Sequence, residues 1–231
     1  MVLKCTHSLM RTASFRKFFD RVGVGSRTFV EFGVENGLEN NTLKLLLEGW
    51  SGLWIEGNER YVTQISQKFH DVVKKGRLRV KFAFINRENV NDIIAEYFTG
   101  EIDLLSIDLD GNDIHILKSI NIIRPRVIVV EYNGKFPPSI NVAQLYNPEY
   151  IWSGSDYGGS SLVAITKMAS HKGYSLVGCS IVGINAFFVR NDLLVEKFQA
   201  PFTAENHYQP ARYFLTFPSG HAPDWGPYEK I

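Results

Sequence analysis

The chain has 231 residues, of which 45% are hydrophobic and 21% charged, and its formal net charge is +1. This length suits one large α/β domain or two small ones, and it buries enough surface to need neither disulfides nor structural metals. The 25 basic and 24 acidic residues lack the basic excess of proteins that grip phosphate backbones, so no nucleic-acid partner is expected.

Two features bear on the cellular compartment. Cys5 and Cys179 are isolated thiols, without a CxxC pair and without a segment that reads as a signal peptide, which favours a reducing, cytoplasmic location. A disulfide between the two is the alternative that the sequence leaves open. No run of 18 apolar residues is present, so no membrane span is expected.

Residues 1–27 are predicted to form a helical lead-in. Its apolar residues, spaced to pack one face of an amphipathic helix on the domain, are Leu9, Phe15, Phe18 and Phe19. No acidic residue precedes Asp20 among several basic ones, which also resembles a transit peptide. The helix is the preferred interpretation because the first strand follows almost immediately.

From Thr28 onward, short apolar runs alternate with helical stretches, the pattern of a parallel sheet wrapped by helices. Strands are predicted at 28–32, 52–56, 79–85, 102–109 and 126–131. Helices are predicted between them at 41–48, 60–75, 91–98 and 113–120. The helix assignment is clearest over 60–75, where apolar residues recur at the spacing of one buried face.

This alternation stops after the fifth strand. Residues 134–160 are rich in Pro, Gly, Ser, Asn and Tyr and are predicted to form a long active-site loop. A helix at 162–171 and two strands, at 174–179 and 185–190, follow.

The predicted fold is therefore α/β. It is a Rossmann-like, doubly wound, seven-stranded and mostly parallel sheet, with an antiparallel strand pair at its C-terminal end. One domain is assigned to 28–195, and 196–231 are predicted to form an irregular aromatic tail.

Doubly wound sheets bind ligands outside the carboxyl ends of their strands, so the first two strand ends are informative. Glu31, Gly33 and Gly37 follow the first strand: the glycines permit a tight turn and close ligand approach, and Glu31 can accept a hydrogen bond from an ammonium or amide. The spacing is not the G-x-G-x-x-G of dinucleotide enzymes, which disfavours NAD. Glu56 ends the second strand, where an acidic residue can take both hydroxyls of a ribose. A plain turn and a solvated charge are the alternatives.

The fourth and fifth strands end in acidic and amide residues. Asp108 follows the fourth strand, and either Asp110 or Asp113 is expected to cap the next helix. Glu131 and Asn133 follow the fifth strand. If Asp108, Glu131 and Asn133 converge, they suit general-base chemistry or a hard cation such as Mg²⁺. Separate solvated charges are the alternative.

Four segments resemble the motif series of the FkbM-type S-adenosylmethionine-dependent methyltransferases. They are FVEFGVENG, LWIEGN, IDLLSIDLDGND and PRVIVVEYN, of which the first and third are the most specific. The resemblance covers about residues 28–133. Here Glu31 stands in place of the family's aspartate, Ser106 in place of a lysine, and Asp110 in place of a glutamate.

The resemblance implies S-adenosylmethionine as the cofactor and assigns its contacts. Glu31, Gly33 and Gly37 would line the methionine part and Glu56 would hold the ribose. The strand exit at Phe84, Ile85 and Asn86 would lie near the adenine. Asp108, beside the ligand crevice, completes the predicted cofactor-binding set.

The resemblance also implies O-methylation of a sugar, glycan or natural product. Asp108 is the predicted proton acceptor, with Glu131 as its partner. The same two carboxylates and Asn133 are the hypothetical ligands of Mg²⁺, as in some sugar O-methyltransferases of related fold. The alternative is a non-catalytic Rossmann-like binding module that retains a nucleotide pocket. The expected partner is a small-molecule or glycan acceptor, and a homo-oligomer is left open.

Overall fold

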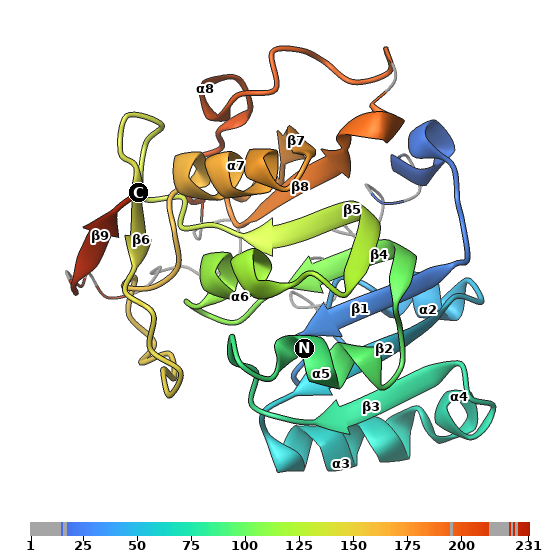
Figure 1. Ribbon diagram of the computed structural model, residues 1–231. Helices are drawn as coiled ribbons and strands as arrows, with labels where there is room; N and C mark the ends of the chain where they lie inside the picture. The colour runs from blue at the N-terminus through green and yellow to red at the C-terminus, as the bar shows by residue number, and fades with distance from the viewer. Residues whose placement is uncertain (1–14, 16–17, 195, 213–221, 223, 225) are drawn as a thin grey trace. The chain divides into compact units, whose positions relative to one another are not determined.

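A computed structural model describes residue 15, residues 18–194 and 196–212, and residues 222, 224 and 226–231 (Figure 1). The chain divides into two compact units. The first comprises Met1–Asp108 and Ile120–Val127, and the second comprises Leu109–Ser119 and Ile128–Ile231. The predicted segment boundaries after residues 27 and 195 stay predictions.

The main sheet has seven strands in the order β3-β2-β1-β4-β5-β8-β7. Their bounds are β1 Thr28–Phe32, β2 Ser51–Glu56, β3 Leu78–Phe82, β4 Gly100–Ile107, β5 Ile123–Glu131, β7 Tyr174–Cys179 and β8 Asn185–Arg190. β1 pairs in parallel with β2 and β4, β2 pairs in parallel with β3, and β7 and β8 are antiparallel. The predicted seven-stranded, mostly parallel sheet with a terminal antiparallel pair is confirmed.

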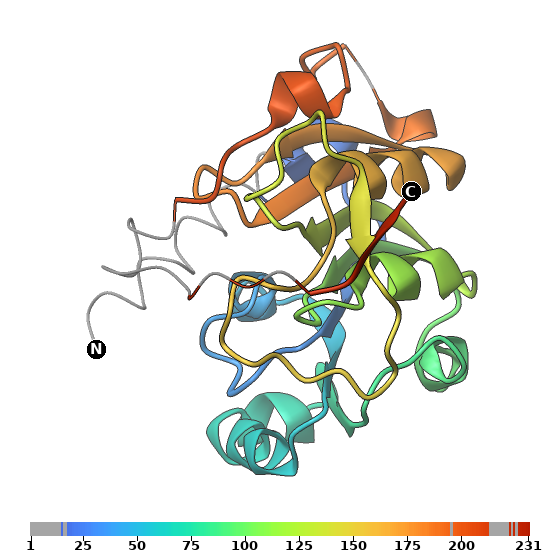
Figure 2. The ribbon, with the colours of Figure 1, turned by 90° about the vertical axis from the view of Figure 1, so that its left-hand side faces the viewer.

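In the first unit, helices cover both faces of the parallel strands. They are α2 Leu43–Leu47, α3 Glu59–Lys68, α4 His70–Lys74 and α5 Val90–Ala95. Figure 2 shows α2 and α3 on one face of these strands and α5 on the other. Because both faces are covered, β1 and β2 are buried along almost their whole length, as their nearly continuous apolar sequences require.

Several predicted elements of this unit differ from the structure in their bounds, and tertiary contacts explain two of the differences. The helix predicted at 60–75 is interrupted at Phe69, whose ring packs edge-on against Trp54 with the ring centroids 5.1 Å apart. The third strand ends at Phe82 and not at residue 85, because its last ladder contact is the bond from the amide of Ala83 to the carbonyl of Glu56. Helical periodicity alone reveals neither tertiary contact.

In the second unit, the predicted helix and strand pair are found with the predicted bounds. α7 spans Leu162–His171 and begins at Ser161, whose side chain accepts a hydrogen bond from the amide of Ala164. The remaining helices are α6 Asp113–Ser119, the 3-10 turn η1 Asn191–Leu193 and α8 Ala204–His207.

The region predicted as a loop at 134–160 contains a short strand. β6 (Val142–Gln144) pairs antiparallel with β9 (Tyr228–Lys230), which belongs to the predicted irregular tail (Figure 1). β6 and β9 are short strands that the sequence did not predict within these segments, and the active-site loop and the irregular tail otherwise stay predictions. Three-residue strands that pair across the sequence leave no alternation long enough to detect.

The N-terminal helix is described only in part. Residues 18–22 are helical, and Phe19 and Val22 are buried, in agreement with a packed apolar face. The ring of Phe19 lies against Trp50 with centroids 4.7 Å apart. Leu9, the other end of the predicted face, lies outside the described residues. No helix within the described ranges is long and apolar enough to cross a membrane.

Candidate functional site

Gly33 occupies a position that only glycine fits. It follows β1 with a φ of +67°, and its amide donates to the carbonyl of Ile55 over 3.1 Å. A Cβ atom there would overlap the main-chain oxygen of Asp108, which directly follows β4. The glycine therefore lets the chain leave β1 in close contact with the residue that leaves β4.

Glu31, the last acidic residue of β1, is buried, with 1% of its surface exposed. One carboxylate oxygen accepts from the amide of Asn41 at 2.7 Å and the hydroxyl of Ser106 at 3.1 Å. The other accepts from the amide and the hydroxyl of Thr42 at 3.0 and 2.5 Å. Burial raises the pKa of Glu31 to about 6, against the opposing effect of these hydrogen bonds. Both oxygens thus hold the chain that enters α2.

Glu56, at the end of β2, is also largely buried, but its carboxylate is less completely used. One oxygen accepts from the amide of Glu35 and the other from the amide of Asn58, each over 2.8 Å. Desolvation raises the pKa of Glu56 above its ordinary value, and hydrogen bonds from the backbone amides of Asn58, Glu35 and Gly57 oppose that shift. A carboxylate has about four acceptor positions, so Glu56 keeps the capacity to accept a hydrogen bond from a ribose.

The chain that leaves β3 places an aromatic ring beside Gly57, the residue that follows Glu56. Phe84 is 46% exposed, and a Cβ atom at Gly57 would lie only 3.1 Å from its ring. Asn86 shapes the following turn: its side-chain oxygen accepts from the amides of Glu88 and Asn89 at 3.1 and 2.8 Å. An exposed ring near the end of β2 offers a surface on which an adenine could stack.

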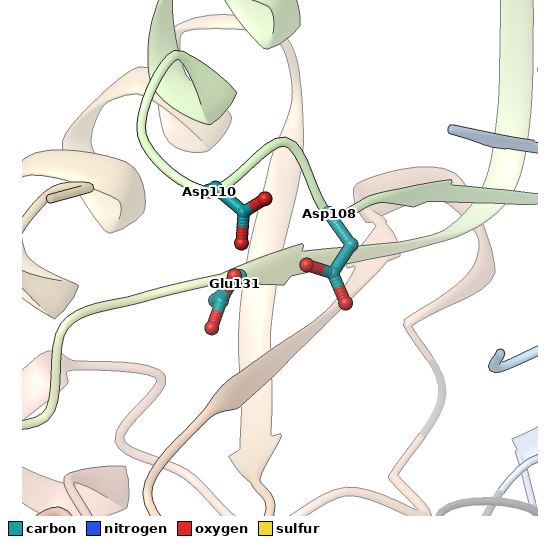
Figure 3. Close-up of side chains that lie close together, drawn as sticks. All are labelled: Asp108, Asp110 and Glu131. Carbon is teal, nitrogen blue, oxygen red and sulfur yellow. The ribbon is translucent and has the colours of Figure 1, made fainter. Parts of the chain in front are cut away.

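Three carboxylates gather where β4 and β5 end (Figure 3). Asp108, Asp110 and Glu131 each offer an oxygen within 4.8 Å of the other two, and the side chains in Figure 3 turn toward one another. Asp108 and Glu131 are half-buried and Asp110 is exposed. A group of this kind can accept a proton or surround a cation, and the roles of Asp108 and Glu131 stay predictions.

Asp110 is the member of this group that the sequence interpretation missed. It was one of two candidate caps for α6; the other, Asp113, accepts from the amides of Leu109 at 3.0 Å and Gly111 at 3.1 Å, which belong to the turn before the helix. Asp110 adopts a left-handed φ of +57° in the turn before the helix. The signal that could have identified it is the spacing of three aspartates within six residues at one strand end.

Asn133, the third hypothetical metal ligand, binds main-chain groups in the loop that follows β5. Its side-chain oxygen accepts from the amide of Lys135 at 3.1 Å. Its nitrogen donates to the carbonyls of Asp156 and Gly158 at 2.9 and 3.0 Å. Asn133 thereby shapes the loop, and its role as a metal ligand stays a prediction.

Aromatic rings from the loop and the tail of the second unit pack together. Tyr157 lies between Tyr150 and Tyr228, with centroid distances of 6.2 and 5.1 Å, and Phe136 lies 5.0 Å from Tyr228. Burial is the largest cause that raises the pKa of Tyr150 to about 12. Tyr228 comes from β9, and no sequence pattern predicted that it would lie beside the loop.

Lys135 fastens the tail to the loop. Its ammonium donates to the carbonyl of Asp156 at 2.8 Å, to the carboxylate of Asp156 at 3.1 Å and to the carbonyl of Asp224 at 3.1 Å. The carboxylate of Asp156 also accepts from the amide of Asp224 at 2.7 Å. We call Lys135, Asp156 and Asp224 the clasp. No motif in the sequence pointed to it.

Comparison with known proteins agrees with this geometry. The family model described as the methyltransferase FkbM domain matches residues 39–175, more than half of the chain. This match begins after the glycine turn that includes Gly33 and Gly37. It takes in Glu56, Asp108 and Glu131.

Solved structures share the fold. An S-adenosylmethionine-dependent methyltransferase from Clostridium acetobutylicum ATCC 824 is 10% identical, with 79% of this chain and 92% of that chain covered and a TM-score of 0.50. Magnesium protoporphyrin IX methyltransferase (ChlM) from Synechocystis PCC 6803, with bound SAH, is 14% identical, with 80% and 83% covered and a TM-score of 0.50. At these identities the likeness shows the fold alone. None of the curated proteins matches the chain.

Proposed function

Because the chain belongs to the FkbM family of methyltransferases, we propose that it transfers a methyl group from S-adenosylmethionine to a hydroxyl group of a small molecule. The observation that carries this proposal is the carboxylate of Glu56. It ends β2, is oriented by the amides of Glu35 and Asn58, and keeps acceptor positions for a ribose.

The residues of the first unit fit an adenosyl cofactor. Gly33 keeps the exit of β1 free of a side chain. Glu56 would accept hydrogen bonds from the ribose hydroxyls, and the exposed ring of Phe84 would stack on the adenine. Gly37 and Asn86 shape the two turns that flank this surface, and Asp108 follows the neighbouring strand.

Bound S-adenosylmethionine would supply an electrophilic methyl group on a sulfonium. The chain then has to align the acceptor hydroxyl and take its proton as the carbon–oxygen bond forms. We assign the proton to a carboxylate oxygen of Asp108, with the carboxylate of Glu131 as its partner.

We infer a sugar, a glycan or a similar natural product as the acceptor. The rings of Tyr150, Tyr157 and Tyr228 suit the apolar faces of a sugar, and the neighbouring carboxylates suit its hydroxyl edges. The same carboxylates could bind Mg²⁺, which remains a hypothesis. Measuring turnover with and without a chelator would test it. A cytoplasmic location is part of the proposal and follows from the isolated cysteines.

The first experiment measures cofactor affinity. Glu56→Ala should weaken the binding of S-adenosylhomocysteine at least tenfold, about 1.4 kcal/mol, because the ribose loses its charged acceptor. Isothermal calorimetry gives the dissociation constants. The control is Glu59→Ala, which removes an exposed glutamate in the first turn of α3. Equal affinities of Glu56→Ala and the native protein would disprove the ribose assignment.

The second experiment separates an enzyme from the alternative, a binding module without catalysis. The protein is incubated with methyl-labelled S-adenosylmethionine and a panel of sugars, glycans and hydroxylated natural products. Label in an acceptor establishes the transferase. Tight cofactor binding without transfer to any member of a broad panel would favour the module.

A further inference from the structure

The side chain of Asn40 is buried without a hydrogen-bonding partner. The residue is 6% exposed, and neither the oxygen nor the nitrogen of its carboxamide has a partner within the described part of the chain. A buried amide without partners is rare in folded proteins, because it has lost water and gained nothing in return. A ligand that hydrogen-bonds to the carboxamide of Asn40 would explain why this polar group is buried.

The neighbours of Asn40 place it at the carboxyl ends of β1 and β4. The next two amides, of Asn41 and Thr42, donate to the carboxylate of Glu31 at 2.7 and 3.0 Å. The carboxamide nitrogen of Asn41 donates to the hydroxyl of Ser106 on β4 at 2.9 Å. Glu31 and Ser106 are direct partners in the parallel ladder. Asn40 is therefore held at the sheet edge where ligands of such folds bind.

The same contacts occupy the residue expected to receive the ammonium of the cofactor. Glu31 already accepts four hydrogen bonds, and a carboxylate has about four acceptor positions. A carboxamide offers two N–H donors and an oxygen acceptor, which complement the carboxylate and the ammonium of an amino acid.

We propose that Asn40 binds the amino-acid end of S-adenosylmethionine and that Glu31 positions it. The proposal rests on the proposed function, because it concerns the same cofactor. The polar atoms of Asn40 are shielded from solvent in this structure. Ligand entry therefore includes a shift of the preceding turn, residues 35–39, in which Glu35 and Leu38 are exposed.

The test compares two ligands that differ only at the amino-acid end. S-adenosylhomocysteine carries that end, whereas 5′-methylthioadenosine has the same nucleoside and lacks it. By calorimetry, Asn40→Ala should weaken S-adenosylhomocysteine roughly tenfold or more and leave 5′-methylthioadenosine within about twofold. Retained binding of the shorter ligand also shows that the variant is folded.

Asn185→Ala is the matched control. Asn185 is fully buried, its carboxamide also has no partner among the described residues, and it lies at the start of β8 in the second unit. Its loss should leave the affinity for both ligands unchanged. The same selective loss in Asn185→Ala would overturn the assignment of Asn40.

A second variant, Asn40→Leu, distinguishes the loss of polar contacts from the loss of packing at this position. Leucine is close to asparagine in size and has no polar atoms, so the ligand-free protein should melt at a higher temperature while S-adenosylhomocysteine binds more weakly. The inference is overturned if the Asn40 variants lose affinity for both ligands equally, or if they keep the native affinity for both. If the native protein binds neither ligand, the proposed function itself fails.

Discussion

Glu31 could either bind a ligand or hold the start of a helix, and the sequence alone cannot distinguish these two roles. An acidic residue before a glycine turn suits a bound ammonium, and it equally suits the amides at the start of a helix. In the structure its oxygens hold Asn41, Thr42 and Ser106, and the hydroxyl of Thr42 in turn accepts from the indole of Trp54 at 2.7 Å. The sequence could predict that an acidic residue at this position accepts hydrogen bonds. It could not predict the donors, because one of them, Ser106, lies 75 residues away in the chain.

The raised pKa of Glu31 makes part of the stability depend on pH. Its pKa is about 6 in the folded chain, against 4.5 without burial, so the folded state binds the proton more tightly between these values. The free energy of unfolding therefore falls by about 2 kcal/mol as the pH rises through this window. Glu31→Gln has no such titration. The stability of the native protein relative to this variant should fall by about 2 kcal/mol from pH 4 to pH 7.5.

Urea unfolding at the two pH values measures this difference. The variant should also be less stable at both values, because a glutamine presents N–H donors to the amides of Asn41 and Thr42. Glu59→Gln, on the exposed face of α3, is the control and should follow the native curve. Parallel curves for Glu31→Gln and the native protein would contradict a pKa raised by burial.

Among the elements, those with long, regular patterns were predictable. β1, α7, β7 and β8 have the predicted bounds, because each has an apolar pattern set by its own residues and ends at a turn. β6 and β9 were not predicted, because each three-residue strand forms by pairing with the other, which is distant in the sequence. The clasp was missed for the same reason, since Lys135 meets Asp224 across 89 residues.

The clasp should control the order of the tail. Lys135→Met keeps the apolar stem beside the rings of Phe136 and Tyr228 but removes three hydrogen bonds from the ammonium. We expect a loss of about 2 kcal/mol in the free energy of unfolding and faster hydrogen exchange in 226–231. Exposed Lys230, on β9, supplies the control Lys230→Met. Native exchange rates in Lys135→Met would show that β6 and β9 hold without the clasp.

At the scale of the whole chain, the two units separate the candidate roles. The predicted cofactor residues all belong to the first unit. Asp110, Glu131, Asn133, the aromatic rings and the clasp belong to the second. The order of the sheet was predictable because alternating strands and helices restrict the topology. The division into two units was not predictable, because it follows tertiary contacts and cuts the sequence at three places.

The division predicts that variants of the second unit change turnover and not cofactor affinity. Glu131→Gln removes one of the two carboxylates to which we assign the transfer of the acceptor's proton. Turnover should fall roughly hundredfold, the usual contribution of a proton-transfer group. The affinity for S-adenosylhomocysteine should stay within about twofold, whereas Glu56→Ala should show the opposite pattern. Calorimetry and label transfer on both variants decide the matter. If Glu131→Gln weakens the cofactor as strongly as Glu56→Ala does, the roles are not divided between the units.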